Sequence, residues 1–167
     1  MPRMNYNDIL EKLKATLESM QTQTNRLRLY EEAKKAIGEN LVFDSPDTSY
    51  DERETGCVLA VRAIFRRALG KELCDTASTI VLYRSLLQDA RFTKVDSPQK
   101  GDIIINPTSF GNGSVTGHVG IYGVDGIMSN DSRDGLKGQW RLNYSYAYWK
   151  SWFEKGGGIP TYYFRMV

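Results

Sequence analysis

The sequence predicts an α+β fold, with helices in the first half of the chain and an antiparallel sheet in the second. Apolar residues recur at helical spacing up to about residue 90, and short apolar runs bounded by glycine or proline follow them. Because the helices precede the strands instead of alternating with them, a parallel sheet is disfavoured. A chain of 167 residues is long enough for one domain with its own core.

The segment from about residue 5 to residue 37 is predicted to be helical. It carries two apolar stripes, the first made of Ile9, Leu13, Leu17 and Met20 and the second of Tyr30, Ala33 and Ile37. The polar stretch 21–25 between the stripes is a candidate break, and Gly38 suits a helix stop. We expect a pair of packing helices here, with a recognition or regulatory arm as the alternative.

A second helix is predicted to begin at Cys57, after a polar loop over residues 44–56, and to end near Gly70. A turn at Gly56 would then deliver Cys57 to the first turn of the helix. The unpaired N–H groups and the positive dipole end favour a thiolate there and would lower the pKa of the cysteine. Such a thiolate suits a nucleophile, whereas the alternative is a small, buried structural cysteine.

A further helix, capped by Thr76 or Ser78, leads into the strands. Strands are predicted at 92–95, 101–105, 117–123, 127–131 and 161–167, with an aromatic helix at 144–155 before the last of them. The turn at 124–126 joins the third and fourth strands into a hairpin.

Composition excludes several classes of function. A net charge of +2 is too small for a nucleic-acid binder that relies on bulk electrostatics. No apolar run is long enough to span a membrane, and the N-terminus lacks the apolar core of a signal peptide. We therefore expect synthesis in the cytoplasm, and release or export if the protein acts elsewhere. Two cysteines and one histidine are too few for a zinc site of such ligands, so we expect no metal or cofactor. We interpret Cys74 as structural and expect no disulfide.

The one histidine, His118, opens an apolar strand directly after Gly117, which would leave space around the imidazole. A cysteine nucleophile needs a base, and the base needs a polar group to orient it. The return strand offers Ser129, Asn130 and Asp131 within hairpin distance. Because neighbouring strand residues face opposite sides, only one of the last two can reach the histidine.

Taken together, these pieces resemble the CHAP and NlpC-type cysteine amidohydrolases and peptidases of the papain-like superfamily. The matching pieces are Gly56-Cys57-Val58, Gly101-Asp102-Ile103-Ile104, Gly117-His118-Val119-Gly120-Ile121-Tyr122 and Asp125-Gly126-Ile127-Met128-Ser129-Asn130. They cover roughly residues 50 to 167 in the family's order. The resemblance implies a papain-like fold, with Cys57 as nucleophile, His118 as base and Asn130 as the orienting residue. Asp131 is the alternative third member, and the backbone N–H of Cys57 would contribute to an oxyanion hole.

The family cleaves amide bonds in bacterial peptidoglycan, so the resemblance implies an endolysin-like endopeptidase or amidase that acts in the periplasm or cell wall. An exported toxin with an immunity protein, a cysteine effector acting on proteins and a non-catalytic binding module are the alternatives. We expect a monomer, with an N-terminal helical segment over 1–43 and a catalytic domain over 44–167. The aromatic residues Trp140, Tyr146, Tyr148, Trp149 and Trp152 are dense enough to line a binding wall, although we favour packing roles for most of them.

Overall fold

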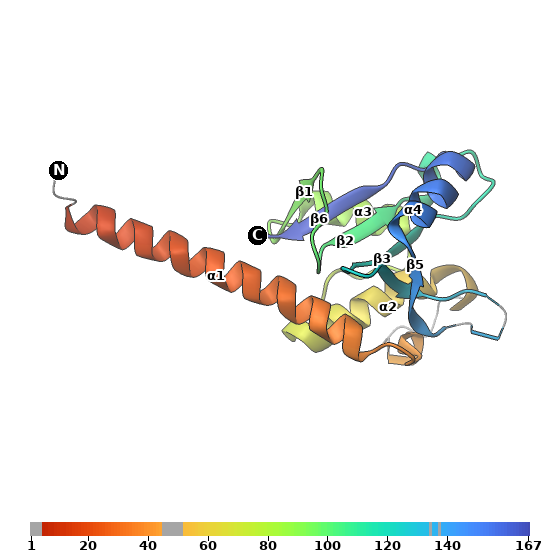
Figure 1. The fold of residues 1–167 in the computed structure, drawn as a ribbon, viewed down its shortest axis with the longest axis horizontal. Coiled ribbons are helices and arrows are strands. Elements are labelled where there is room, and N and C mark those ends of the chain that lie inside the picture. The colour runs from red at the N-terminus through yellow and green to blue at the C-terminus, as the bar shows by residue number, and fades with distance from the viewer. Residues whose placement is uncertain (1–4, 45–51, 134, 137) are drawn as a thin grey trace.

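The computed structural model describes residues 5–44, 52–133, 135–136 and 138–167 (Figure 1). Its helices are α1 (Tyr6–Lys35), α2 (Glu52–Leu69), α3 (Thr79–Gln88) and α4 (Tyr146–Trp149), with 3₁₀ turns η1 (Leu41–Asp44) and η2 (Thr108–Phe110) and a π-helical segment η3 (Lys150–Gly156). Its strands are β1 (Phe92–Val95), β2 (Ile103–Asn106), β3 (His118–Tyr122), β4 (Ile127–Asn130), β5 (Trp140–Tyr144) and β6 (Tyr162–Met166).

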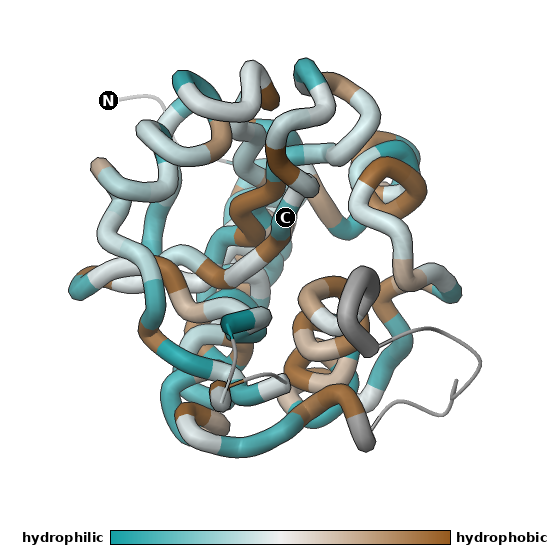
Figure 2. Tube along the Cα trace, turned by 90° about the vertical axis from the view of Figure 1, so that its right-hand side faces the viewer, coloured by the Kyte–Doolittle hydropathy of each residue, from teal (hydrophilic) through white to brown (hydrophobic). Residues whose placement is uncertain are grey.

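The six strands form one antiparallel sheet in the order β1-β6-β2-β3-β4-β5. This arrangement confirms the predicted α+β class and the predicted hairpin, which is β3 paired with β4. The end of α1 together with α2 and α3 covers one face of the sheet, and α4 with η3 lies against the other. Apolar stretches run through the middle of the body, where the sheet meets these helices (Figure 2).

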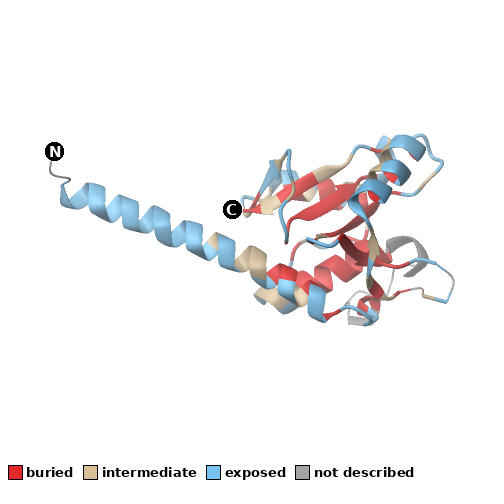
Figure 3. Cartoon of the chain, in the orientation of Figure 1, coloured by how far each residue is buried: buried red, intermediate tan, exposed pale blue. Residues whose placement is uncertain are grey.

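Strand alternation divides the interior into two cores. In β2, Ile103 and Ile105 point into the larger core with α1, α2 and α3, whereas Ile104 points into the smaller core. The smaller core contains Trp149 and Phe153 of the α4–η3 segment. The sheet is therefore covered on both faces, which explains why β2 and β4 are buried along their whole length and β3 along all but its last residue (Figure 3).

Helix α1 is continuous, so the predicted break at 21–25 is wrong. Its first turn is closed by a capping box in which the Asn5 side chain accepts from the backbone of Asp8 and the Asp8 side chain accepts from the backbone of Asn5. Within the polar stretch, Gln21 donates to Asn25 at 3.0 Å along the helix surface. Polar residues that pair one turn apart are compatible with an uninterrupted helix.

The prediction of a packing helix pair is also wrong, because α1 projects from the body (Figures 1 and 3). Residues 5–21 are exposed throughout, and the buried residues of α1 are Leu29, Tyr30 and Ala33 near its end. Ile37, assigned to the second stripe, lies beyond the helix and is exposed. No helix in the described parts of the chain is long and apolar enough to cross a membrane.

The buried ion pair of Asp102 and Arg165 joins the loop before β2 to β6. The Asp102 carboxylate is fully buried, accepts from the backbone N–H of Gln99 at 2.7 Å and pairs with Arg165 Nη2 at 2.7 Å. We expect Asp102→Ala to lower the free energy of unfolding by about 3 kcal/mol, because it leaves the partly buried guanidinium without its partner. Urea unfolding followed by circular dichroism measures this loss.

Glu11→Ala is the matched control, because it removes the exposed Glu11–Lys14 pair, which spans 3.3 Å. That change is expected to alter the free energy of unfolding by at most about 0.5 kcal/mol. Equal losses in the two variants would contradict the structural role assigned to Asp102.

Candidate active site

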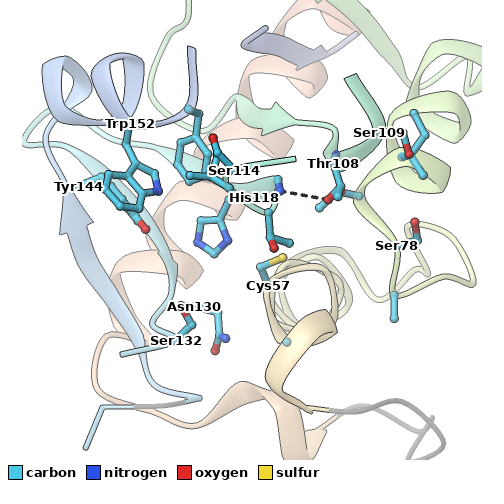
Figure 4. Close-up of a pocket in the computed structure, with 18 residues that line it drawn as sticks. Cys57, Ser78, Thr108, Ser109, Ser114, His118, Asn130, Ser132, Tyr144 and Trp152 are labelled. Carbon is cyan, nitrogen blue, oxygen red and sulfur yellow. Dashed lines mark hydrogen bonds between the residues drawn. The ribbon is translucent and has the colours of Figure 1, made fainter. Parts of the chain in front are cut away.

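A pocket of about 620 Å³ lies where α2 meets the starts of β3 and η3, and it brings together the residues singled out from the sequence (Figure 4). Cys57, His118 and Asn130 all line it. The other described lining residues include no acidic or basic side chain, and Thr79 and Thr108 contribute hydroxyl groups. The pocket can therefore bring a thiol, an imidazole and a side-chain amide to one bound molecule.

Cys57 lies in the second turn of α2, since the helix begins at Glu52. The predicted loop over 44–56 is thus wrong for its last five residues, and residues 45–51 lie outside the described parts of the chain. The Cys57 side chain faces the sheet and is 6% exposed, and the Val119 backbone is close enough to influence its pKa. Val119 follows His118 in β3, and both Cys57 and His118 line the pocket.

The predicted lowering of the Cys57 pKa is wrong. Burial raises the pKa of this thiol to about 11, and the backbone hydrogen bonds of Val119, Val58 and Cys57 itself only partly oppose that rise. In the second turn the dipole effect is weaker than at the helix end, and the Cys57 N–H falls within the regular i→i−4 hydrogen-bonding pattern. Cys57 is therefore a neutral thiol, and its N–H lies within the regular helix instead of at the free end.

Gly56 is required by close packing and not by a turn. A Cβ added there would lie 2.7 Å from Asn130 Nδ2 and 3.2 Å from a methyl group of Val42. The missing side chain leaves room for the Asn130 side chain of β4 against α2, next to Cys57. The same holds for Gly117, where a Cβ would lie 2.2 Å from the carbonyl oxygen of Asn106. Gly117 thus allows close backbone packing, whereas open space at the imidazole was predicted.

His118 is the first residue of β3, and its side chain lies among aromatic rings on the face opposite to α2. Its ring stacks on Phe153 with centroids 5.9 Å apart and also contacts Trp149 at 5.6 Å and Tyr144 at 5.7 Å. This burial lowers the pKa of His118 to about 4, against the opposing effects of the Asn130 backbone and the Asp131 carboxylate. The imidazole is therefore neutral at physiological pH and can act as a base.

A chain of hydrogen bonds orients the imidazole. His118 Nε2 lies 3.0 Å from Ser129 Oγ, which donates to Asn143 Oδ1 at 2.7 Å. Because the serine hydroxyl has one proton and gives it to the carbonyl oxygen of Asn143, it accepts from Nε2–H. The proton-free Nδ1 is then the basic atom of His118.

The side chain that holds Ser129 comes from an irregularity in β5. Ile127 pairs with Tyr144 and Met128 pairs with Leu142, so Asn143 is the extra, unpaired residue of a bulge. Both Asn143 and Tyr144 thereby reach the side of the sheet on which His118 lies. Bulges are not visible in the apolar pattern of a strand, and sequence reasoning missed Asn143.

The hydrogen bond predicted between Asn130 and His118 is not formed. The Asn130 side chain points to the opposite face, against Gly56, and its buried Oδ1 has no hydrogen-bond partner among the described residues. The alternative, Asp131, is paired with Arg133 at 2.6 Å. Although burial acts to raise the pKa of Asp131, the hydrogen bonds from Arg133 outweigh it and lower that pKa. Ser129, also noted from the sequence, is the residue that contacts the imidazole.

The aromatic residues divide between packing and lining. Trp140 and Trp149 are fully buried, Tyr146 and Tyr148 are exposed outside the pocket, and Trp152 lines the pocket while remaining about half exposed. Packing therefore accounts for the two buried indoles, and Trp152 alone of the five contributes to the pocket wall. Both cysteines are free thiols. Within the described residues, no group of three or more His, Cys, Asp or Glu side chains could hold a metal ion.

No protein-family model matches the sequence, and no curated protein matches it either. The structure is similar to a chain in the crystal structure of the type VI native effector–immunity complex Tae3-Tai3 from Ralstonia pickettii. The two chains are 22% identical and align with a TM-score of 0.50, over 85% of this chain and 98% of the other. At this level of identity the similarity establishes a shared fold.

The raised Cys57 pKa makes a testable statement about thiol reactivity. In a Cys74→Ser background, which removes the second thiol, the rate of Cys57 alkylation by iodoacetamide should keep rising as the pH increases from 6 to about 10. The rise follows the small thiolate fraction, which grows tenfold for each pH unit below the pKa. Mass spectrometry of the alkylated protein measures the rate, and a plateau already reached at pH 6 would show a preformed thiolate instead.

Proposed function

We propose that this protein is a cysteine-dependent amide hydrolase with a papain-like fold that cleaves bacterial peptidoglycan. The observation that supports the proposal is the shared pocket, which Cys57 and His118 both line. The serine and asparagine behind the imidazole serve as orienting groups for a catalytic base.

The reaction starts from a neutral pair. His118 Nδ1 takes the thiol proton as Cys57 Sγ bonds to the carbonyl carbon of the scissile amide. The tetrahedral intermediate collapses, the C–N bond breaks, and the imidazolium returns the proton to the leaving amine. A water molecule, deprotonated by the same nitrogen, then attacks the thioester and regenerates the thiol. Hydrogen bonding to Ser129 keeps the ring in the required tautomer and orientation throughout.

The substrate is proposed from two similarities. The resemblance of the Cys57, Asp102 and His118 segments to CHAP and NlpC-type hydrolases supports an amide bond of the cell wall. The structural neighbour comes from a type VI effector–immunity complex, which supports an exported effector over a phage endolysin. The protein would then act in the periplasm of a target cell and be neutralised by an immunity protein.

The pocket lining supports recognition through hydrogen bonds. Because Cys57 and His118 are both neutral near neutral pH, none of its described lining residues carries a charge there, while Thr79, Thr108 and Asn130 offer polar atoms. Asn130 Oδ1 is buried without a partner among the described residues, so it is placed to accept an N–H group from a bound peptide. We therefore assign Asn130 to substrate binding and Ser129 to orientation of the base.

The nucleophile is tested by digesting purified peptidoglycan and analysing the muropeptides by mass spectrometry. Cys57→Ala should abolish the formation of new amide-cleavage products, because no other described thiol lies in the pocket. Cys74→Ala is the matched control and should retain activity. Cleavage by Cys57→Ala, or equal loss in the two variants with both folded, would contradict the assignment. Unchanged muropeptides with the wild-type enzyme would reject peptidoglycan as the substrate.

Neighbouring substitutions on β4 separate orientation from binding. Ser129→Ala should lower kcat by roughly 10- to 100-fold with little change in KM, because the base loses its orienting partner. Asn130→Ala should chiefly raise KM, since it removes a contact with the bound substrate. Steady-state kinetics on a purified muropeptide provide both constants. A large loss of kcat in Asn130→Ala beside a near-wild-type Ser129→Ala would restore Asn130 as the orienting residue.

A further inference from the structure

The projecting part of α1 carries an apolar seam that faces solvent. Tyr6, Leu10, Leu13, Leu17 and Met20 follow one another at spacings of four and three residues, and Leu27 continues the pattern after Thr24. The first five are between 36% and 74% exposed. On a surface helix of a monomeric protein the apolar face normally packs against the core. This seam is exposed instead, so it has no packing partner within the described chain.

The spacing of the seam identifies the kind of partner. A repeat of alternating fours and threes averages 3.5 residues, which matches a second helix wound around the first in a left-handed coiled coil. A helix lying on a globular core follows 3.6 residues per turn, and its seam would drift around the axis over this length. The complement of this seam is therefore another helix with the same repeat.

The residues beside the seam allow a second copy of the same helix to bind. The positions that flank the seam are occupied by Asn7, Ile9, Lys14, Thr16, Gln21 and Gln23. Only Lys14 among them is charged, so two identical helices would meet with little repulsion between like charges. The apolar area that a pair of these seams can bury is on the order of 1,000 Å², the size at which specific interfaces begin.

Other occupants fit less well. A helix that binds anionic membranes presents a basic face, whereas the exposed residues 5–21 carry three acidic side chains, Asp8, Glu11 and Glu18, and two basic ones, Lys12 and Lys14. The seventeen residues 5–21, which begin with a complete capping box, form a helical stretch in which no residue is buried by the described parts of the chain. Because isolated helices of about this length are marginally stable in water, burial of the seam supplies the stabilisation that the projecting segment lacks.

We propose that the protein forms a homodimer through a two-stranded coiled coil between the projecting segments of α1, from Tyr6 to about Leu27. This differs from the monomer expected from the sequence. Each protomer of the dimer keeps its own pocket with Cys57 and His118, because no residue of α1 lines that pocket. The proposal is therefore independent of the activity assigned to the pocket.

The test measures molar mass by light scattering after size-exclusion chromatography, from low to high micromolar protein. The wild-type chain should approach twice its 19.0 kDa mass as the concentration increases. The double variant Leu13→Glu, Leu17→Glu should remain monomeric over the same range, because it places charges in the seam. The matched control Ala15→Glu, Ser19→Glu places the same charges on the outer side of the helix and should dimerise like the wild type.

Circular dichroism verifies that each variant keeps its folded body, which α1 joins through Leu29 and Ala33 outside the mutated region. A wild-type chain that stays monomeric at high concentration would overturn the proposal, and so would dimerisation of the seam variant. Loss of dimerisation in both double variants would also overturn it. A monomer that binds anionic vesicles through the seam would identify a membrane as the occupant instead.

Discussion

The packing of α2 against β3 and β4 is the contact on which the site depends. It requires a glycine at position 56, because a side chain there would collide with Asn130 at 2.7 Å. One residue further along the helix, the Cys57 thiol meets the backbone of Val119 and so lies beside the residue that bears the imidazole. Cys57 and His118 are thus held by two elements of secondary structure and not by loops, which favours precise geometry.

Burial sets the electrostatics of the pair. It raises the pKa of Cys57 to about 11 and lowers that of His118 to about 4, so both groups are neutral between these values. The aromatic rings around His118 supply this desolvation and also restrict its movement. In such surroundings a thiolate–imidazolium ion pair is disfavoured at rest, and in the proposed mechanism proton transfer accompanies attack on the substrate.

The sequence was sufficient for the α+β class, for five of the six strands, for the β3–β4 hairpin and for the placement of Cys57 and His118 in one pocket, but strand β5 was missed. Periodicity and glycine turns are local signals, so these features could be predicted. The hydrogen bonds from His118 through Ser129 to Asn143 could not be predicted. The side of β4 that faces His118 determines that Ser129 and not Asn130 contacts the imidazole, and a bulge in β5 brings Asn143 within reach of Ser129. The start of α2 and the exposure of α1 also depend on tertiary packing, which periodicity does not encode.

In this pocket His118 is neutral and protonated on Nε2, and the Cys57 thiol is neutral as well. Because the chain has one histidine, ¹⁵N-labelled imidazole spectra recorded over a pH titration report on this side chain alone. We expect the spectra to show the Nε2–H tautomer of His118 and a His118 pKa of about 4. A pKa near or above the usual value of about 6.5, or an imidazolium signal at neutral pH, would contradict it and restore a thiolate–imidazolium pair.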